Sequence, residues 1–200
     1  MSAAKTAAAL AIGLLTSLPA LDSDILRSLS VDITRRDPAD RMRGWKSATN
    51  ALENFRHDLE KQNREQLFLI ADERGRASEI SFYLREKRVE GPGHPPCYVV
   101  ESQDIANQFS FWPRYDEFVE RPAGAPHPDQ QTYTEESGVN LFTGRSALYV
   151  QDAGRKNVPH NIRAAFTSAD QAAQIEVRRF GKTIRTWDVY LCRKYRTLPL

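Results

Sequence analysis

The segment with the most unusual side chains runs from Asn107 to Tyr115 and reads NQFSFWPRY. It interleaves aromatic rings, among them Trp112, with the amides of Asn107 and Gln108. Aromatic faces stack on the apolar faces of sugars, and amides hydrogen-bond sugar hydroxyls, so this composition suits carbohydrate binding. The same rings can instead plug the edge of a sheet, which is the commoner role for buried aromatic residues. The sequence leaves both interpretations open.

Three cations stand in other loops. Arg74 follows an apolar run and a short acidic pair, and Arg155 and Lys156 follow another apolar run. A guanidinium placed after a strand can meet a phosphate group, although Arg74 can as well pair with Glu79. We therefore treat all three cations as candidates for a substrate or an interface.

Several other kinds of chemistry find no support in the sequence. No G-x-G-x-x-G or G-K-[ST] loop is present, and no G-x-S-x-G precedes a helix. Cys97 and Cys192 are the only cysteines, which excludes a four-thiolate zinc site, and the pair His94 and Cys97 has no second pair at ligand spacing. The net charge is +2, and the basic residues are spread along the chain. We expect no metal, no cofactor and no nucleic-acid partner for this chain.

Two apolar runs flank a helical pattern and predict the element that positions Arg74. Residues 67–71 form a continuous apolar run, a helix is expected near Ala77 to Leu84, and Cys97 to Val100 form a second run. Continuous apolar runs are typical of buried parallel strands, so this unit reads as a βαβ crossover. Ala147 to Gln151 predict a third strand of the same kind.

Parallel strands place the loops that follow them along one edge of the sheet. The three strands therefore predict a common edge where candidate residues from three loops meet. These residues are Arg74, Asn107, Gln108, Trp112, Arg155 and Lys156.

The other elements complete an α/β fold. An apolar stripe that includes Trp45, Leu52 and Phe55 predicts a long helix from Pro38 to about Lys61, with Asp37 as its N-cap. A short helix is expected from Pro159 to about Phe166, and residues 175–192 alternate around Gly181 as an antiparallel hairpin does. We expect a Rossmann-like mixed sheet, parallel in its centre and flanked by helices.

Residues 6–21 form an uncharged apolar segment that is shorter than the roughly 20 residues that span a bilayer. Three interpretations compete: a signal peptide, the end of a longer membrane helix, or a buried helix. The first two place the rest of the chain outside the cytoplasm. We divide the chain into residues 1–24, a truncated membrane helix or signal peptide, and residues 25–200, a single soluble α/β domain.

Five strings in the sequence occur in a familiar order and spacing. They are D-P-x-D-R-x-R-G-W from Asp37, A-D-E-R-G-R-A-S-E-I-S-F-Y-L from Ala71, N-Q-F-S-F-W from Asn107, G-R-S-A-L-Y-V from Gly144 and I-R-T-W-D-V-Y-L-C-R-K-Y from Ile184. Together they resemble the C-terminal soluble portion of the dolichyl-phosphate-mannose-protein mannosyltransferase-like family. That family is glycosyltransferase family 39, and it includes the aminoarabinose transferases that modify lipid A.

The resemblance implies an extracytoplasmic accessory domain of a membrane enzyme that uses a polyprenyl-phosphate sugar as donor. Its implied partners are the membrane domain of the same transferase and the lipid bilayer, on the periplasmic or extracellular face. In that family the catalytic carboxylate lies near the N-terminal membrane spans, so no residue of this chain inherits that role. The alternative from a different functional class is a secreted, free-standing module that binds carbohydrate or protein.

Overall fold

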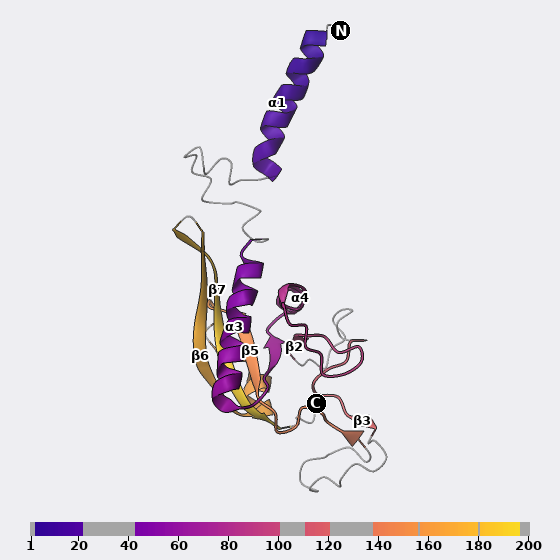
Figure 1. Cartoon of the computed structure of the whole chain (residues 1–200), viewed down its shortest axis with the longest axis vertical. Helices are drawn as coiled ribbons and strands as arrows, with labels where there is room; N and C mark the ends of the chain where they lie inside the picture. The colour runs from indigo at the N-terminus through magenta and orange to yellow at the C-terminus, as the bar shows by residue number, and fades with distance from the viewer. Residues whose placement is uncertain are drawn as a thin grey trace. The chain divides into compact units, whose positions relative to one another are not determined.

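The computed structural model describes residues 3–21, 43–100, 111–120, 138–155, 157–179 and 181–196. The chain divides into two compact units, Met1–Arg43 and Gly44–Leu200. The described part of the first unit is the helix α1 (Ala3–Leu21), drawn in indigo in Figure 1. No helix among the described residues is both long enough and apolar enough to cross a membrane.

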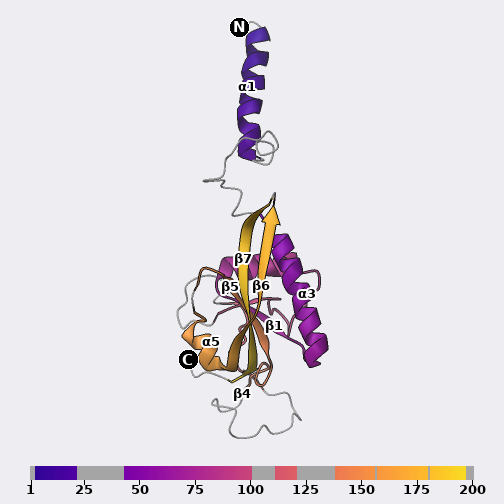
Figure 2. The same cartoon turned by 90° about the vertical axis from the view of Figure 1, so that its left-hand side faces the viewer.

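The second unit is built on a five-stranded mixed sheet with the order β2-β1-β5-β7-β6. Its strands are β1 (Phe68–Ala71), β2 (Tyr98–Val99), β5 (Ala147–Asp152), β6 (Phe166–Arg179) and β7 (Lys182–Tyr195). The first three run parallel to one another, whereas β7 is antiparallel to β5 and β6 is antiparallel to β7. The sheet is therefore mixed, as predicted, but its parallel strands β2, β1 and β5 fill one side of it and not its centre. The antiparallel C-terminal hairpin fills the other side, and its strands form the long ribbon in Figure 2.

Helices cover the two faces of this sheet, and each face has its own hydrophobic cluster. Alternate residues of β1 divide between the faces, with Leu69 in one cluster and Phe68 in the other. The first cluster includes residues of α3 (Trp45–Asn63) and α4 (Arg74–Tyr83), and the second includes residues of α5 (His160–Ala165). All four residues of β1 are buried, as expected for a strand covered on both sides.

The predicted apolar stripe of the long helix is confirmed. Leu52 is fully buried, and Trp45, Phe55 and Leu59 pack against the first cluster while keeping part of their surface exposed. The predicted start of this helix is wrong, because α3 begins at Trp45. The residue before it, Gly44, has φ = 79°, a left-handed conformation that interrupts an α-helix. Asp37, which was predicted to be the N-cap, lies outside the described residues.

The remaining elements are the short α5, which agrees with its predicted range, and a small second sheet. That sheet pairs β3 (Val119–Glu120) with β4 (Gly138–Val139) in antiparallel fashion. The two strands flank residues 121–137, which lie outside the described residues.

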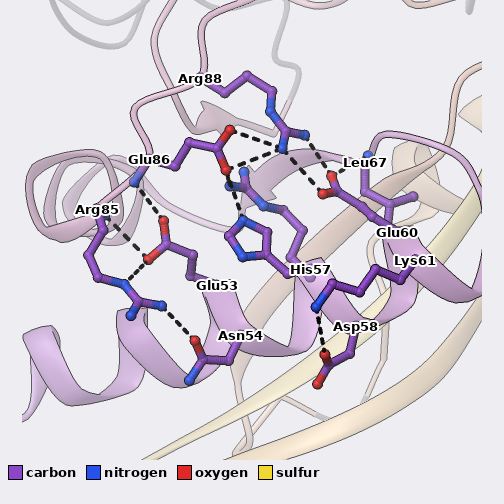
Figure 3. Close-up of polar contacts among 11 residues, drawn as sticks. Glu53, Asn54, His57, Asp58, Glu60, Lys61, Leu67, Arg85, Glu86 and Arg88 are labelled. Atoms are coloured by element: carbon purple, nitrogen blue, oxygen red, sulfur yellow. Dashed lines mark hydrogen bonds and ion pairs between the residues drawn. The ribbon is translucent and has the colours of Figure 1, made fainter.

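A network of charged groups fastens the end of α4 to α3 (Figure 3). The carboxylate of Glu53, which is fully buried, accepts hydrogen bonds from the backbone N–H of Arg85 at 3.3 Å and of Glu86 at 2.8 Å. It also accepts one from Nε of Arg85 at 2.6 Å. Burial by itself raises the pKa of the Glu53 carboxyl, but these hydrogen bonds outweigh it, so the pKa lies below its ordinary value.

The same network continues along α3. Glu60 accepts hydrogen bonds from Nη1 of Arg88 at 2.7 Å and from the backbone N–H of Leu67 at 2.8 Å, just before β1 begins. His57 lies 2.9 Å from Glu86. Successive turns of α3 thus make polar contacts either with the segment that follows α4 or with the segment that leads into β1, as Figure 3 shows. These contacts fix α4 and the first strand relative to each other.

Candidate functional site

The candidate site lies at the carboxyl ends of β1 and β5. In the sheet, β1 lies between β2 and β5. The chain leaves β1 through α4 and returns as β2 on one side of β1, whereas β5 pairs with β1 on its other side. In an open α/β sheet, a place where successive connections leave in opposite directions is where ligands or partners commonly bind. Asp72 directly follows β1 and Asp152 is the last residue of β5, so two carboxylates stand at this point.

Arg76 joins these two carboxylates. Its Nε donates to Oδ1 of Asp72 at 2.6 Å, and its Nη2 lies 2.9 Å from Oδ2 of Asp152. The side chains of Arg76 and Asp72 are both only 1% exposed, whereas Asp152 is 57% exposed. The buried guanidinium thus reaches from a buried carboxylate to one at the surface.

Local structure explains why these groups meet. The N–H of Asp72 donates to the carbonyl of Val150 at 3.0 Å, which extends the ladder between β1 and β5 past the end of β1. The helix α4 begins two residues later, so Asp72 and Arg76 are separated by one helical turn. A short turn between the strand and the helix is therefore enough to aim Arg76 at both strand ends.

Two tryptophans enclose the guanidinium of Arg76. The rings of Trp45 and Trp187 lie 5.8 Å apart between centroids and are tilted by 52°. The Cζ atom of Arg76 lies 5.9 Å from the centre of the Trp45 ring and 5.5 Å from that of Trp187. On Trp45 a second guanidinium, that of Arg185, stacks at 3.7 Å. We call Trp45, Asp72, Arg76, Asp152, Arg155, Arg185 and Trp187 the Arg76 cluster.

The charges of the cluster act on one another. Burial by itself lowers the pKa of Arg76, but the hydrogen bonds and charges of Asp72 and Asp152 outweigh it and raise that pKa above its ordinary value. The pKa of Arg185 is lowered by burial and then by the charge of Arg76. Both carboxylates of the cluster are already engaged by the guanidinium of Arg76, so the cluster suits recognition or rigidity more than acid–base catalysis.

Three buried polar atoms of the cluster have no hydrogen-bond partner. They are Oδ2 of Asp72, Nη1 of Arg76 and Nε1 of Trp187. Nε of Arg155 lies 3.4 Å from Oδ2 of Asp72 and forms an ion pair with it. Buried polar groups are normally satisfied, so three unsatisfied atoms in one cluster mark a place where the fold keeps unused hydrogen-bonding capacity.

Comparisons with protein-family models, with curated proteins and with solved structures find no match to this chain.

The structure brings two of the predicted site residues to this edge. Arg74 is the first residue of α4 and is exposed, and Arg155 is 53% exposed beside Asp72. Trp112 keeps 42% of its surface exposed. Its neighbour Tyr115 packs on Phe68 at the start of β1, with ring centroids 5.7 Å apart. Asn107, Gln108 and Lys156 lie outside the described residues, so their place at the common edge stays a prediction.

The residues at the heart of the cluster were missed as site residues by the sequence analysis. Asp72 and Arg76 are four residues apart directly after a buried strand, and that spacing was the available signal. Trp187 and Asp152 belong to separate strands, and nothing in their local sequence predicts that β7 lies beside β5. Among the described residues, no group of three His, Cys, Asp or Glu side chains could hold a metal ion.

Proposed function

We propose that this chain is the extracytoplasmic accessory domain of an integral-membrane glycosyltransferase similar to family 39. The parent enzyme transfers a sugar from a polyprenyl-phosphate donor to a lipid or protein acceptor. In this proposal α1 belongs to the end of the last membrane span, and the Rossmann-like unit that follows it is not catalytic by itself. The catalytic carboxylate belongs to the membrane part of the enzyme.

One observation carries this proposal: separate strings of the family resemblance supply one cluster. The first string contributes Trp45, the second contributes Asp72 and Arg76, and the fifth contributes Arg185 and Trp187. The fourth string covers the start of β5, the strand that ends at Asp152. The strings carry the family resemblance only by their order and spacing in the sequence, yet residues from several of them lie together in one cluster. Residues that share a role are expected to meet in this way.

The exposed part of the cluster gives the proposed domain a surface for its membrane partner. Arg155 lies beside Asp72 and the half-exposed Asp152, and the exposed Arg74 begins α4 at the same edge of the sheet. Arginine binds phosphate and carboxylate groups through paired hydrogen bonds. The edge is thus suited to docking against a membrane domain that holds a phosphate-linked sugar, with the buried Arg76 fixing the geometry of the loops.

A second candidate function, a secreted carbohydrate- or protein-binding module, is favoured by a different observation. Phe111 is 75% exposed and stands next to the exposed Trp112. Exposed aromatic rings are common where proteins bind sugars or other proteins. The two proposals make opposite predictions about membranes, which separates them.

The first test is whether the reading frame upstream of Met1 encodes repeated hydrophobic spans. We expect that it does, and that membranes containing the whole product transfer labelled sugar from a polyprenyl-phosphate donor. The purified 200-residue chain should transfer none. Release of the chain into the medium after cleavage near Ala20 would instead support the secreted module.

The second test concerns the carboxyl edge in the whole enzyme. Arg74→Ala with Arg155→Ala should lower transfer about tenfold or more, because a charge-assisted hydrogen bond is worth about 1.5–3 kcal/mol. The matched control, Lys61→Ala with Arg163→Ala, removes two exposed cations from other surfaces and should leave transfer unchanged. Equal activity of the two double variants would contradict a docking role for this edge.

A further inference from the structure

The fold gathers basic side chains at one end of the second unit, although they are scattered in the sequence. They are Lys46, Arg178, Arg179, Lys182 and Arg185, and we call them the basic end. Glu176 lies among them on β6, and the carboxylates of Asp152 and Glu79 are near enough to Arg185 to act on its charge. Since the whole chain carries a net charge of only +2, the rest of the molecule is net negative and the basic end stands out against it.

The strand register and the packing of Gly44 define this end. Arg179 pairs with Lys182 next to the β6–β7 turn, and Val177 pairs with Arg185 two steps further in. A Cβ placed on Gly44 would lie 3.0 Å from Cδ1 of Ile184, so the start of α3 abuts the hairpin near its turn. Figures 1 and 2 show the turn of the hairpin projecting at the same end of the unit as the start of α3.

Four of the five side chains of the basic end are exposed, and that of Arg185 is half-buried against the ring of Trp45. Lys46, Arg179 and Lys182 are exposed, and the side chain of Arg178 is 68% exposed. Arg178 lies 3.0 Å from Glu176 on the same strand, and an ion pair at such an exposed position contributes little free energy. The four exposed side chains therefore present positive charge to an anionic partner.

We propose that the basic end rests on the surface of an anionic membrane. This inference depends on the proposed function, in which α1 lies in the bilayer. Residues 22–43 lead from α1 to Gly44, so the end of the unit that contains Gly44 is the end at which it is attached to the membrane helix. Cations at that attachment point meet lipid phosphates and carboxylates, whose negative surface potential reaches about a Debye length into solution.

The test compares two charge-reversal variants of the full chain in vesicle flotation. The first is Arg178→Glu, Arg179→Glu and Lys182→Glu. The matched control is Lys61→Glu, Arg163→Glu and Arg193→Glu, which makes the same change in net charge at exposed positions away from the basic end. Vesicles are either phosphatidylcholine alone or equal parts of phosphatidylcholine and phosphatidylglycerol, and circular dichroism with thermal unfolding confirms that each variant is folded.

We expect the unchanged protein to prefer the anionic vesicles, and the basic-end variant to lose that preference by on the order of a hundredfold, because each basic residue near an anionic surface contributes about a factor of five. About 1 M salt, which shortens the Debye length to about 3 Å, should abolish the preference as well. The control variant should keep most of it. Equal losses in the two variants, or no preference in the unchanged chain, would overturn the inference.

The two vesicle types also separate this inference from the proposed function. Binding to phosphatidylcholine alone reports insertion of α1, because those vesicles carry no net charge. Binding to neutral vesicles without any anionic preference would support α1 as a membrane segment and contradict a membrane role for the basic end. An anionic preference located at the basic end without binding to neutral vesicles would support the basic end and count against α1 as a membrane segment.

Discussion

Arg76 is the residue on which the candidate site depends most. Its guanidinium is almost fully buried, and its charge is balanced by one buried and one half-exposed carboxylate. Burying charges costs several kcal/mol per ion, and a buried ion pair is often no more stabilising than well-packed apolar side chains. The two neighbouring tryptophans and the three unsatisfied polar atoms also favour a role for this cluster other than stability.

Removal of Arg76 should nevertheless be costly. Arg76→Met leaves the carboxylate of Asp72 buried without its closest partner, and breaking a buried pair from one side typically costs about 3–5 kcal/mol. We expect a loss of that size in the free energy of unfolding, measured by urea denaturation. A loss below about 1 kcal/mol would mean that the ion pair with Arg155, or water, is enough to solvate Asp72.

The double variant identifies the cause of that loss. Asp72→Asn combined with Arg76→Met removes the charge on both sides, so its cost should be about 1–3 kcal/mol smaller than the sum of the two single costs. Additive losses would show that packing against Trp45 and Trp187, not charge pairing, is the main contribution of Arg76.

Glu53 should make the stability of the unit dependent on pH in the acid range. Its pKa lies below its ordinary value in the folded chain, so ionised Glu53 stabilises the fold at neutral pH. That contribution is complete above about pH 5 and is lost as the pH falls through the lower pKa of the folded state. The Glu53→Gln variant places an amide against donors from Arg85 and Glu86, and should lose about 2 kcal/mol at pH 7.

The measurement is the free energy of unfolding at a series of pH values. The difference between the unchanged chain and Glu53→Gln should be largest above pH 5 and should shrink toward about pH 2. If the difference in free energy of unfolding stayed constant across this pH range, the effect of Glu53 would come from the packing of its side chain and not from its charge.

The two cysteines should be unreactive in the folded chain. Cys97 and Cys192 are free and buried, and they belong to the clusters on opposite faces of the sheet, which excludes the neighbourhood that a disulfide needs. Burial raises the pKa of the Cys97 thiol far above its ordinary value and raises that of Cys192 to about 12. We expect no thiol titration with an aromatic disulfide reagent at pH 8 until denaturant is added, and two thiols per chain afterwards.

At the scale of elements, the junction between α3 and the hairpin depends on a glycine. Gly44 has φ = 79°, and a Cβ there would lie 3.0 Å from Ile184 and 3.4 Å from Val177. Gly44→Ala should destabilise the unit by about 2–3 kcal/mol, of which about 1 kcal/mol is the cost of the left-handed backbone conformation. The control is Gly144→Ala, because Gly144 has φ = 78° with no atom within 4 Å of the added Cβ.

Gly144→Ala should therefore cost only the conformational part. The difference between the two variants in thermal unfolding measures how tightly α3 is packed against β6 and β7. Identical losses would indicate that the side chain of Ile184 moves aside and that this junction is soft.

How far the sequence predicts these elements depends on whether the signal is local. Leu67 to Ala71 and Ala147 to Gln151 were recognised as strands because fully buried parallel strands are continuous apolar runs. The stripe of α3 was recognised because helical periodicity is local as well. The start of α3 was not, because a left-handed glycine such as Gly44 cannot be distinguished by sequence from an ordinary one.

The strand order and the Arg76 cluster could not be predicted for a related reason. The pairing of β5 with β7 joins segments about forty residues apart, and no local pattern specifies it. In the sequence, Arg76 is one charged residue within a helical pattern, and Trp187 is one position of an alternating strand. Neither pattern predicts that the two side chains meet. Their meeting is a consequence of the topology, as is the collection of scattered cations at the basic end.

At the scale of the whole molecule, the second unit has hydrophobic clusters and a polar network of its own. Among the described residues, the buried members of the two hydrophobic clusters lie between Ala48 and Tyr195, and the network in Figure 3 lies on α3, the segment before β1 and the segment after α4. The division of the chain at Gly44 agrees with this distribution. The stability of the unit should thus be independent of residues 1–42.

A chain that begins at Arg43 should therefore unfold in urea with the same midpoint and the same slope as the full chain, since the slope reports the surface exposed on unfolding. The control is a chain that begins at Arg64 and lacks α3. Its loss uncovers the face of the sheet on which Ala48 and Leu52 are buried and removes the carboxylates of Glu53 and Glu60, so it should not fold cooperatively. A midpoint that drops in the chain beginning at Arg43 would show that residues 1–42 contribute contacts to the fold, and the two units would then have to be treated as one folding unit.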